Sequence, residues 1–282
     1  MSALRVSFEF FPPKTPEAEA SLWKTVERLA PLNPEFVSIT YGADGSTRER
    51  THQVIESLLT NTNLQPVPHL TCVGAPQEEI DSIAHEYWNM GVRQIVALRG
   101  DPERGAEADY VPHPHGYAYA SDLVQGLLEK HPFELFIAAY PETHPQAISA
   151  DADLENLKRK VDAGGHRAIT QFFFDNEIFL RFRDRVAAAQ IDVALIPGIL
   201  PVTNFNTLVR FAGACGASIP QSLSTVFEGL DEDPTTRQLI AAHAAVSQAE
   251  DLGREGVEDF HFYTLNRADL SFAVCHALGV RS

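Results

Sequence analysis

Short apolar runs alternate along this chain with longer segments in which apolar residues recur at helical spacing. Apolar runs of this length are typical of parallel strands buried on both faces, and the longer segments between them are typical of crossover helices. The predicted strands are Val6–Phe11, Phe36–Tyr41, Val67–Cys72, Gln94–Leu98, Phe133–Ala139, Ala168–Phe173, Val193–Ile196 and Asp259–Tyr263.

Three of the intervening segments place apolar residues on one helix face. These faces are formed by Leu22, Val26 and Leu29, by Leu154, Leu157 and Val161, and by Ile178, Phe182 and Val186. The stretch from Gly198 to Gly256 is longer than one crossover needs, so extra helical material, Asp233–Gly253, is expected before the last strand. The order predicts an α/β fold, a (β/α)8 TIM barrel with extra helices before the last strand, as a single catalytic domain over residues 1–282.

Composition narrows the class of protein. With 44% hydrophobic and 21% charged residues, the chain can bury a large core. Its formal net charge of −16 opposes binding to nucleic acid or anionic lipid. We find neither an apolar signal core at the N-terminus nor a membrane-length apolar stretch, so a cytoplasmic protein is expected.

Several common motifs are absent from the sequence. Cys72, Cys215 and Cys275 form no CxxC pair, and neither HxxxH nor HExxH occurs, which favours buried reduced thiols and no metal. Because no two glycines are separated by a single residue, the GxGxxG fingerprint is missing, and GxxxxGK is missing too. A dinucleotide would have to bind in another way.

Polar residues where barrel strands end are candidates for an active site. Glu9 interrupts the apolar run Val6–Phe11, and burial would raise its pKa toward that of a general acid. A structural ion pair to a neighbouring strand is the alternative. Gly100, between Arg99 and Asp101, would let a backbone approach a ligand, although Asp101 could equally cap a turn.

Further polar residues follow the other strands and line one helix face. Those at strand ends could instead be hydrogen-bonded core groups; they are Thr40, Tyr41, His69, Thr71, Tyr140 and Gln171. On one helix, Asp153, Asn156 and Lys160 share a face, with Arg159 beside them. This patch could hold a pyrophosphate, or it could be a solvated face favourable to the helix dipole.

These positions together resemble the methylenetetrahydrofolate reductase family from about Val6 to Val280. The segments that carry the resemblance are Val6–Pro13, Tyr41–Ala43, Pro68–Cys72, Ala97–Asp101, Ile169–Asp175 and Ile196–Pro201. The resemblance implies a flavoprotein oxidoreductase of one-carbon metabolism. It would reduce 5,10-methylenetetrahydrofolate to 5-methyltetrahydrofolate by ping-pong hydride transfer from NADH or NADPH through FAD, for methionine biosynthesis.

The resemblance also implies roles for individual residues. Glu9 is the proton donor, and the second catalytic residue, Asp101, lies near the flavin and contacts the pterin. FAD is bound by Tyr41, Ala43, His69, Arg99, Gly100, Asp101, Tyr119, Ala120, Tyr140, His144, Asp153, Asn156, Arg159 and Lys160. The substrates are bound by Thr40, Asp101, Gln171, Phe211, Tyr263 and Arg267. Phe211 would pack over a substrate ring, although with Leu208 it could equally form an ordinary core stripe.

Some features depart from the family pattern or stay open. Thr207 stands where some relatives carry Gln, and the loop Gly105–Tyr117 is long and rich in Pro and His. The chain ends soon after the last barrel helix, so regulation by adenosylmethionine is not expected. A flavin- or folate-binding barrel without redox turnover is an alternative. A lyase or aldolase barrel is a second alternative, but this sequence has no strand-end lysine suited to a Schiff base. NADH against NADPH preference, and a homo-oligomeric state, are left open.

Overall fold

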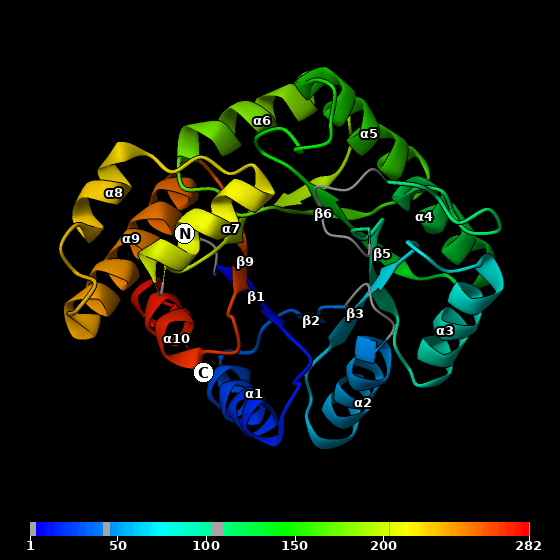
Figure 1. Cartoon of the computed structure of the whole chain (residues 1–282), viewed down its shortest axis with the longest axis horizontal. Helices are drawn as coiled ribbons and strands as arrows, with labels where there is room; N and C mark the ends of the chain where they lie inside the picture. Colours follow the sequence, from blue (N-terminus) through cyan, green and yellow to red (C-terminus); the bar gives the residue numbers. More distant parts are fainter. Residues whose placement is uncertain (1–3, 42–45, 103–109, 203, 282) are drawn as a thin grey trace.

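In the computed structural model, which describes residues 4–41, 46–102, 110–202 and 204–281, parallel strands form a barrel surrounded by helices (Figure 1). The strands are β1 Arg5–Phe10, β2 Val37–Ile39, β3 Pro66–Thr71, β4 Gln94–Leu98, β5 Glu134–Ala139, β6 Arg167–Thr170, β7 Ala194–Ile196, β8 Gly198–Ile199 and β9 Asp259–Tyr263. The predicted fold class is confirmed, and every predicted strand is present within a few residues of its expected bounds.

The barrel closes through a strand that is interrupted at Pro197. The sheet order runs from β7 through β6, β5, β4, β3, β2 and β1 to β9 and β8. Its two ends, β7 and β8, are consecutive in the chain and are separated only by Pro197, which lacks an amide hydrogen for the ladder. The Pro197 carbonyl instead accepts a hydrogen bond from the His261 amide at 3.0 Å. Eight strand positions therefore surround the axis.

Helices cover the outside of the barrel. They are α1 Pro16–Leu29, α2 Ser46–Asn61, α3 Gln77–Asn89, α4 Ala120–Lys130, α5 Ala150–Asp162, α6 Asn176–Ala188, α7 Phe205–Cys215, α8 Gln221–Phe227, α9 Pro234–Arg254 and α10 Ala268–Ala277, with the 3-10 turn Ala30–Leu32 after α1. Local signals start several of them. In α1, for example, the Thr15 hydroxyl accepts from the Ala18 amide, and Pro16 occupies the first turn.

Alternate residues of each strand pack on opposite sides of the barrel wall. Residues such as Phe8, Phe10 and Ile39 belong to the core shared with the helices. A separate apolar cluster fills the barrel interior, formed by Phe36, Val67, Val96, Phe136, Ile169 and Ile196. The interior side also carries polar residues, among them Ser7 and Glu9 of β1, and these position the chemistry described below.

The helix faces were predicted largely correctly, with differences in detail. Leu22, Val26 and Leu29 are all buried, whereas in α6 Phe179 is buried in place of the predicted Ile178. On α5, Leu157 is buried but Leu154 and Val161 are only partly so, because Lys160 takes up part of the inner face. Of the three cysteines, which are all unpaired, Cys215 is only half-buried, which corrects the expectation for that residue.

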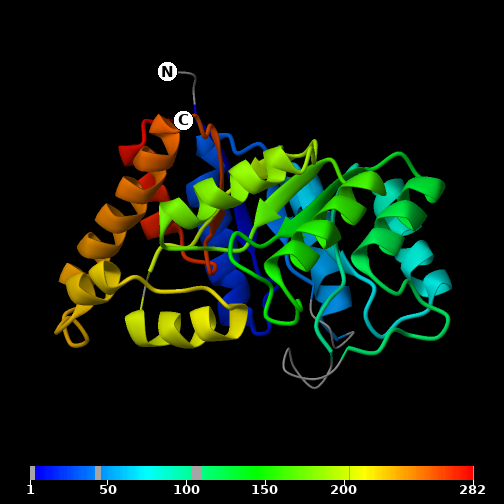
Figure 2. The same ribbon diagram turned by 90° about the horizontal axis from the view of Figure 1, so that it is seen from above.

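The extra helical material before β9 is larger than predicted. Besides α9, which matches the expected Asp233–Gly253, it includes α7 and α8. These helices share a satellite core formed by Phe172, Leu200, Val202, Leu208, Ala212, Phe227 and Ala241. Figure 2 shows both termini at one end of the barrel and the yellow helix α7 lying across the opposite end, where the strands end.

Charged residues close the end of the barrel at which the strands begin. Arg5 pairs with Asp259, and Arg167 pairs with Glu35 at 2.7 Å and with Asp259 at 3.9 Å. The Arg167 guanidinium also lies over the ring of Phe136, with 5.2 Å between its carbon and the ring centroid. This charged floor leaves the opposite end of the barrel for ligands.

Candidate functional site

Glu9 lies at the end of β1 with two histidines facing the same carboxylate oxygen. Its Oε2 is 3.5 Å from His69 Nε2 on β3 and 3.8 Å from His261 Nε2 on β9. The residue is only 8% exposed. The expected burial is therefore confirmed. Within the described part of the chain its ion-pair contacts are these two imidazoles, one of them on the neighbouring strand β9, so the geometry fits the alternative of a structural ion pair to a neighbouring strand as well as it fits a general acid.

His69, predicted as a cofactor contact, is itself buried. Burial lowers its pKa, and the neighbouring Glu9 only partly opposes this effect. Among the residues that the structure describes, its buried Nε2 has no hydrogen-bond partner. A neutral imidazole with an unpartnered nitrogen beside Glu9 is therefore available to a ligand.

His261 was missed by the sequence reasoning, although it is fully buried under Glu9. Its Nδ1 is 2.8 Å from Ser7 Oγ, and its Nε2 is 3.4 Å from Ser38 Oγ. Its ring stacks on Phe36 at 5.5 Å between centroids. The available signal was the alternation Asp-Phe-His-Phe-Tyr in β9, which places His261 on the same side of the strand as Tyr263.

Tyr263, predicted as a substrate contact, forms the wall next to Glu9. Its hydroxyl donates to the Thr170 carbonyl at 2.8 Å, and its ring packs edge-on against His261. Burial and the nearby Glu9 raise the pKa of Tyr263 well above its ordinary value, so it stays a neutral phenol. The main-chain oxygen of Glu9 accepts a 2.6 Å hydrogen bond from the Thr264 hydroxyl, which fixes the end of β1.

Arg99, Gly100 and Asp101 follow β4 at the same end of the barrel. Gly100 has a φ of +85° and its missing side chain would lie 2.5 Å from Val73 Cγ1, so the adjacent loop already requires glycine here. Asp101 is largely exposed, with a loose 4.0 Å contact to Arg99. Its carboxylate is thus exposed at the end of the barrel at which the strands end.

An aromatic contact that the sequence did not predict orients Arg99. Its guanidinium lies 4.6 Å from the centroid of Tyr110, and Tyr110 packs against Tyr119 at 5.7 Å. Tyr119 precedes α4, where Asp122 accepts from its amide, and Ala120 is the first residue of the helix. The predicted cofactor residues Arg99, Tyr119 and Ala120 therefore belong to one surface, which Tyr110 connects.

The basic patch on α5 lines a small cavity of about 40 Å³. Of the predicted cofactor residues, it brings together Tyr140, His144, Asp153, Asn156 and Lys160. Lys160 is only 8% exposed and donates to the Ala138 carbonyl at 2.5 Å. Burial lowers its pKa to about 8, and Asp153 only partly offsets this effect. The alternative of a solvated helix face therefore does not apply to Lys160, because this side chain is buried.

The remaining groups around this cavity are held by local contacts. His144 donates its amide to Asp153 at 2.9 Å and packs against the Tyr140 ring, and burial lowers its pKa. Burial likewise raises the pKa of Tyr140 to about 12, a shift that a hydrogen bond with Gln171 reduces. Arg159 is exposed at the rim, with a long 3.5 Å contact to Asn156.

Other predicted residues lie around the rim. Thr40 and Tyr41 follow β2 and are partly buried, and Arg267 is exposed at the N-cap of α10. Phe211 on α7 is 46% exposed, whereas Leu208 on the same helix is 3% exposed, so Phe211 is outside the core. Ala43 lies outside the described residues, as do residues 105–109 of the loop expected at 105–117.

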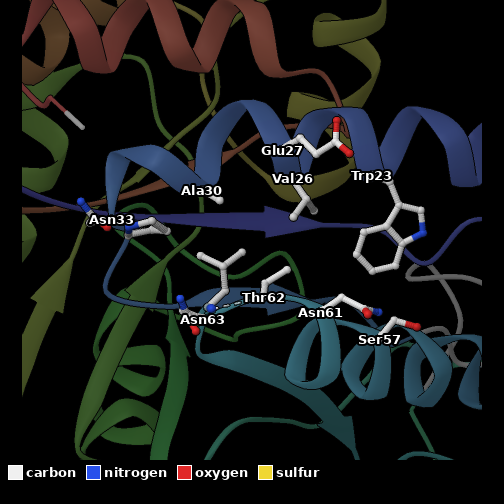
Figure 3. A pocket seen from close by; sticks show the side chains of 11 residues that line it. Trp23, Val26, Glu27, Ala30, Asn33, Ser57, Asn61, Thr62 and Asn63 are labelled. Carbon is white, nitrogen blue, oxygen red and sulfur yellow. Dashed lines mark hydrogen bonds between the residues drawn. The ribbon is translucent and has the colours of Figure 1, made fainter.

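A wider cavity of about 750 Å³ lies elsewhere, on the outer wall between α1 and α2 (Figure 3). It is lined by Trp23, Glu27 and Asn61, among others, and by none of the strand-end residues above. The titratable residue of its lining, Glu27, is exposed, in contrast to the buried Glu9 and Lys160. Among described residues, no three His, Cys, Asp or Glu side chains are grouped to hold a metal ion. None of the helices described is both long and apolar enough to span a bilayer.

Comparisons with known proteins identify the family of the chain. A model of the methylenetetrahydrofolate reductase family matches residues 2–279. The chain is 55% identical over 278 residues to the 5,10-methylenetetrahydrofolate reductase of Salmonella typhimurium, covering 99% of this chain and 92% of that protein. It is 54% identical to the Escherichia coli enzyme of the same name, with the same coverage.

Solved structures show the same fold at low identity. An uncharacterized protein from Clostridium thermocellum, which binds two copies of 5-methyl-5,6,7,8-tetrahydrofolic acid, aligns with a TM-score of 0.63 and 14% identity. The alignment covers 99% of this chain and 95% of that protein. The family model and the two relatives above show that the chain belongs to the methylenetetrahydrofolate reductase family.

Proposed function

We propose that the chain reduces 5,10-methylenetetrahydrofolate to 5-methyltetrahydrofolate with NADH or NADPH, using bound FAD in ping-pong order. Methylenetetrahydrofolate reductase activity is the function of its family. Two observations carry the finer proposal: the buried carboxyl group of Glu9 on β1, and the buried amine of Lys160, which donates to Ala138 near the end of β5. In the order of the sheet β4, which Arg99, Gly100 and Asp101 follow, lies between β1 and β5.

FAD fits the residues that are present. The cavity beside Lys160 combines one buried cation with amide, imidazole and phenol groups, a donor set suited to phosphate and ribose oxygens. The unpartnered Nε2 of His69 supplies a further polar contact near Glu9. When bound, FAD supplies the two-electron hydride chemistry that carboxyl, imidazole and phenol groups lack. In this proposal Arg159 and Lys160 would hold the phosphates of FAD. Arg99, Tyr119 and Ala120 would contact the rest of the cofactor.

Glu9 performs the acid step of this proposal. The methylene carbon of the substrate bridges two nitrogens, and one carbon–nitrogen bond must break before the carbon accepts hydride. Glu9 donates its proton to the leaving nitrogen, which takes the electron pair of that bond. In this proposal the neutral Tyr263 and the exposed Asp101 would flank the folate ring, and Gln171 would present its amide to each substrate in turn.

Substrate contacts complete the proposal. The exposed ring of Phe211 lies on α7, across the end of the barrel at which the strands end, and would stack on a planar substrate. Arg267 would meet an anionic part of folate at the rim, and Thr40 would contact the nicotinamide. We extend the proposal to methionine synthesis in the cytoplasm, a compartment that the three unpaired cysteines fit.

Anaerobic half-reactions test the proposal. The purified protein should be yellow, lose its flavin absorbance when NADH or NADPH is added, and regain it when methylenetetrahydrofolate follows. Lys160→Met should reduce FAD retention, whereas Lys158→Met, which removes an exposed lysine of the same helix, should not. A colourless protein without measurable affinity for FAD would contradict the cofactor, and bleached protein that folate fails to reoxidise would contradict the substrate.

A further inference from the structure

The His261 imidazole occupies the middle of the barrel between two serines and Glu9. It is 0% exposed, with its face against Phe36. Strand register brings these groups together, because Ser7 on β1 is opposite His261, and Glu9 is opposite Ser38 on β2. The two ring nitrogens therefore face different partners. Which of the two carries the proton decides what the imidazole offers to each partner.

A chain of contacts ending at a carbonyl determines which nitrogen carries the proton. Ser7 Oγ is 3.3 Å from the Phe260 carbonyl oxygen and 2.8 Å from His261 Nδ1. A carbonyl only accepts, so Ser7 satisfies both contacts at once only if it gives its single hydrogen to Phe260 and accepts from His261 Nδ1. In that arrangement Nδ1 carries the proton, and Nε2 of the neutral imidazole is left with a lone pair.

That lone pair points toward the proton donor. Nε2 is 3.4 Å from Ser38 Oγ and 3.8 Å from Glu9 Oε2. Contacts of this length in a protein without ligand commonly shorten when substrate binds. We propose that His261 is a positioning residue which, held as the Nδ1–H tautomer by Ser7, presents an acceptor to Glu9 and keeps the proton on that carboxyl group between turnovers.

The inference rests on the proposed function, in which Glu9 gives one proton per turnover to the folate nitrogen. After that transfer Glu9 is a carboxylate and must regain one proton from water. An acceptor beside Oε2 favours the protonated form and raises the pKa of a carboxyl group, whereas a donor there would favour the ionised form. In the described residues, the titratable groups facing Glu9 are His69 from β3 and His261 and Tyr263 from β9.

Nitrogen NMR of the full-length protein tests the tautomer without any folate reaction. With ¹⁵N-labelled histidine, the His261 signals are identified by their loss in His261→Gln. We expect a protonated Nδ1 and an unprotonated Nε2 at pH 7.5. A protonated Nε2 would overturn the inference and leave the proposed reduction of folate untouched.

Ser7→Ala tests the effect on Glu9. Without the hydroxyl, the proton should move to Nε2 and donate toward Glu9. The pH profile of flavin reoxidation by methylenetetrahydrofolate should then shift by about one unit to lower pH, while bleaching by nicotinamide keeps its rate. Ser7→Thr retains the hydroxyl and should restore the profile, and the buried Ser271→Ala on α10 is the matched control.

The outcomes separate the two proposals. An unchanged profile in folded Ser7→Ala would overturn the role of His261, as would an equal shift in Ser271→Ala. A wild-type protein that fails to reoxidise with folate would overturn the proposed function itself. If Ser7→Ala does not fold, the NMR measurement on wild-type protein still decides.

Discussion

Tyr263 donates its phenol hydrogen to the main-chain oxygen of Thr170, 93 positions earlier in the chain, at 2.8 Å. The Thr170 hydroxyl in turn accepts from the Gly198 amide at 2.9 Å. These bonds join β6, β8 and β9 where the interrupted strand closes the barrel. A side chain at Gly198 would lie 2.3 Å from the Thr170 carbonyl and 2.6 Å from the Tyr263 ring.

Gly198→Ala should therefore damage both fold and site. The added methyl group overpacks backbone and ring together, which should lower the free energy of unfolding by ~1–3 kcal/mol and displace Tyr263. Urea unfolding and the KM for folate measure the two effects. The control is Gly213→Ala in α7, where nothing lies within 4 Å and a small stabilisation is expected. Equal stability of the Gly198 variant and wild type would show that the closure tolerates a side chain.

The barrel itself was predictable because its strands are apolar runs with both faces buried, and the buried carboxyl group of Glu9 because a charge inside such a run is conspicuous. His261 was not. A lone histidine in an alternating strand is compatible with any core, and its partners Ser7 and Ser38 are 254 and 223 positions away. Tyr110 was missed for the same reason, since only the fold brings it over Arg99.

The cavity around Lys160 predicts a pH dependence for cofactor binding. Burial lowers the pKa of Lys160 to about 8, so the amine loses its proton above that pH when the cavity is empty. Phosphate binding favours the protonated amine and must then include proton uptake. FAD affinity should fall about tenfold between pH 7 and pH 9, as measured by flavin fluorescence. Lys160→Met should remove this dependence, whereas Lys158→Met should keep it.

Phe211 and Leu208 provide a contrast on one helix. Phe211→Ala should change the free energy of unfolding by less than about 1 kcal/mol but raise the KM of a substrate, because the exposed ring stacks on a ligand. Leu208→Ala should cost about 2–5 kcal/mol, because its side chain is buried in the satellite core. Thermal unfolding with steady-state kinetics separates them. A sharp loss of stability in Phe211→Ala with unchanged KM would show that Phe211 is a core residue and not a substrate contact.

The charged floor should affect stability without affecting chemistry. Arg167→Met leaves Glu35 and Asp259 with Arg5 as their shared cation and should lower the free energy of unfolding by roughly 1–3 kcal/mol. Arg181→Met removes an exposed pair with Glu177 and should have little effect. Urea unfolding measures the difference, and both variants should keep wild-type half-reactions. A changed rate of either half-reaction in Arg167→Met would show that the charged floor affects the chemistry as well as stability.

Glu9→Gln separates the two halves of the proposed reaction. The amide keeps the size of the side chain but carries no transferable proton, so the folate carbon–nitrogen bond loses its acid. Bleaching by NADH or NADPH needs no such acid and should survive, while reoxidation by methylenetetrahydrofolate should slow by about 100-fold or more. Anaerobic stopped-flow absorbance measures each half separately. Glu134→Gln on β5 is the matched control, since Glu134 accepts from Gln94 at the floor and faces no predicted substrate. Reoxidation of Glu9→Gln at the wild-type rate would remove Glu9 from the role of general acid, and with it the reason for His261 to present an acceptor.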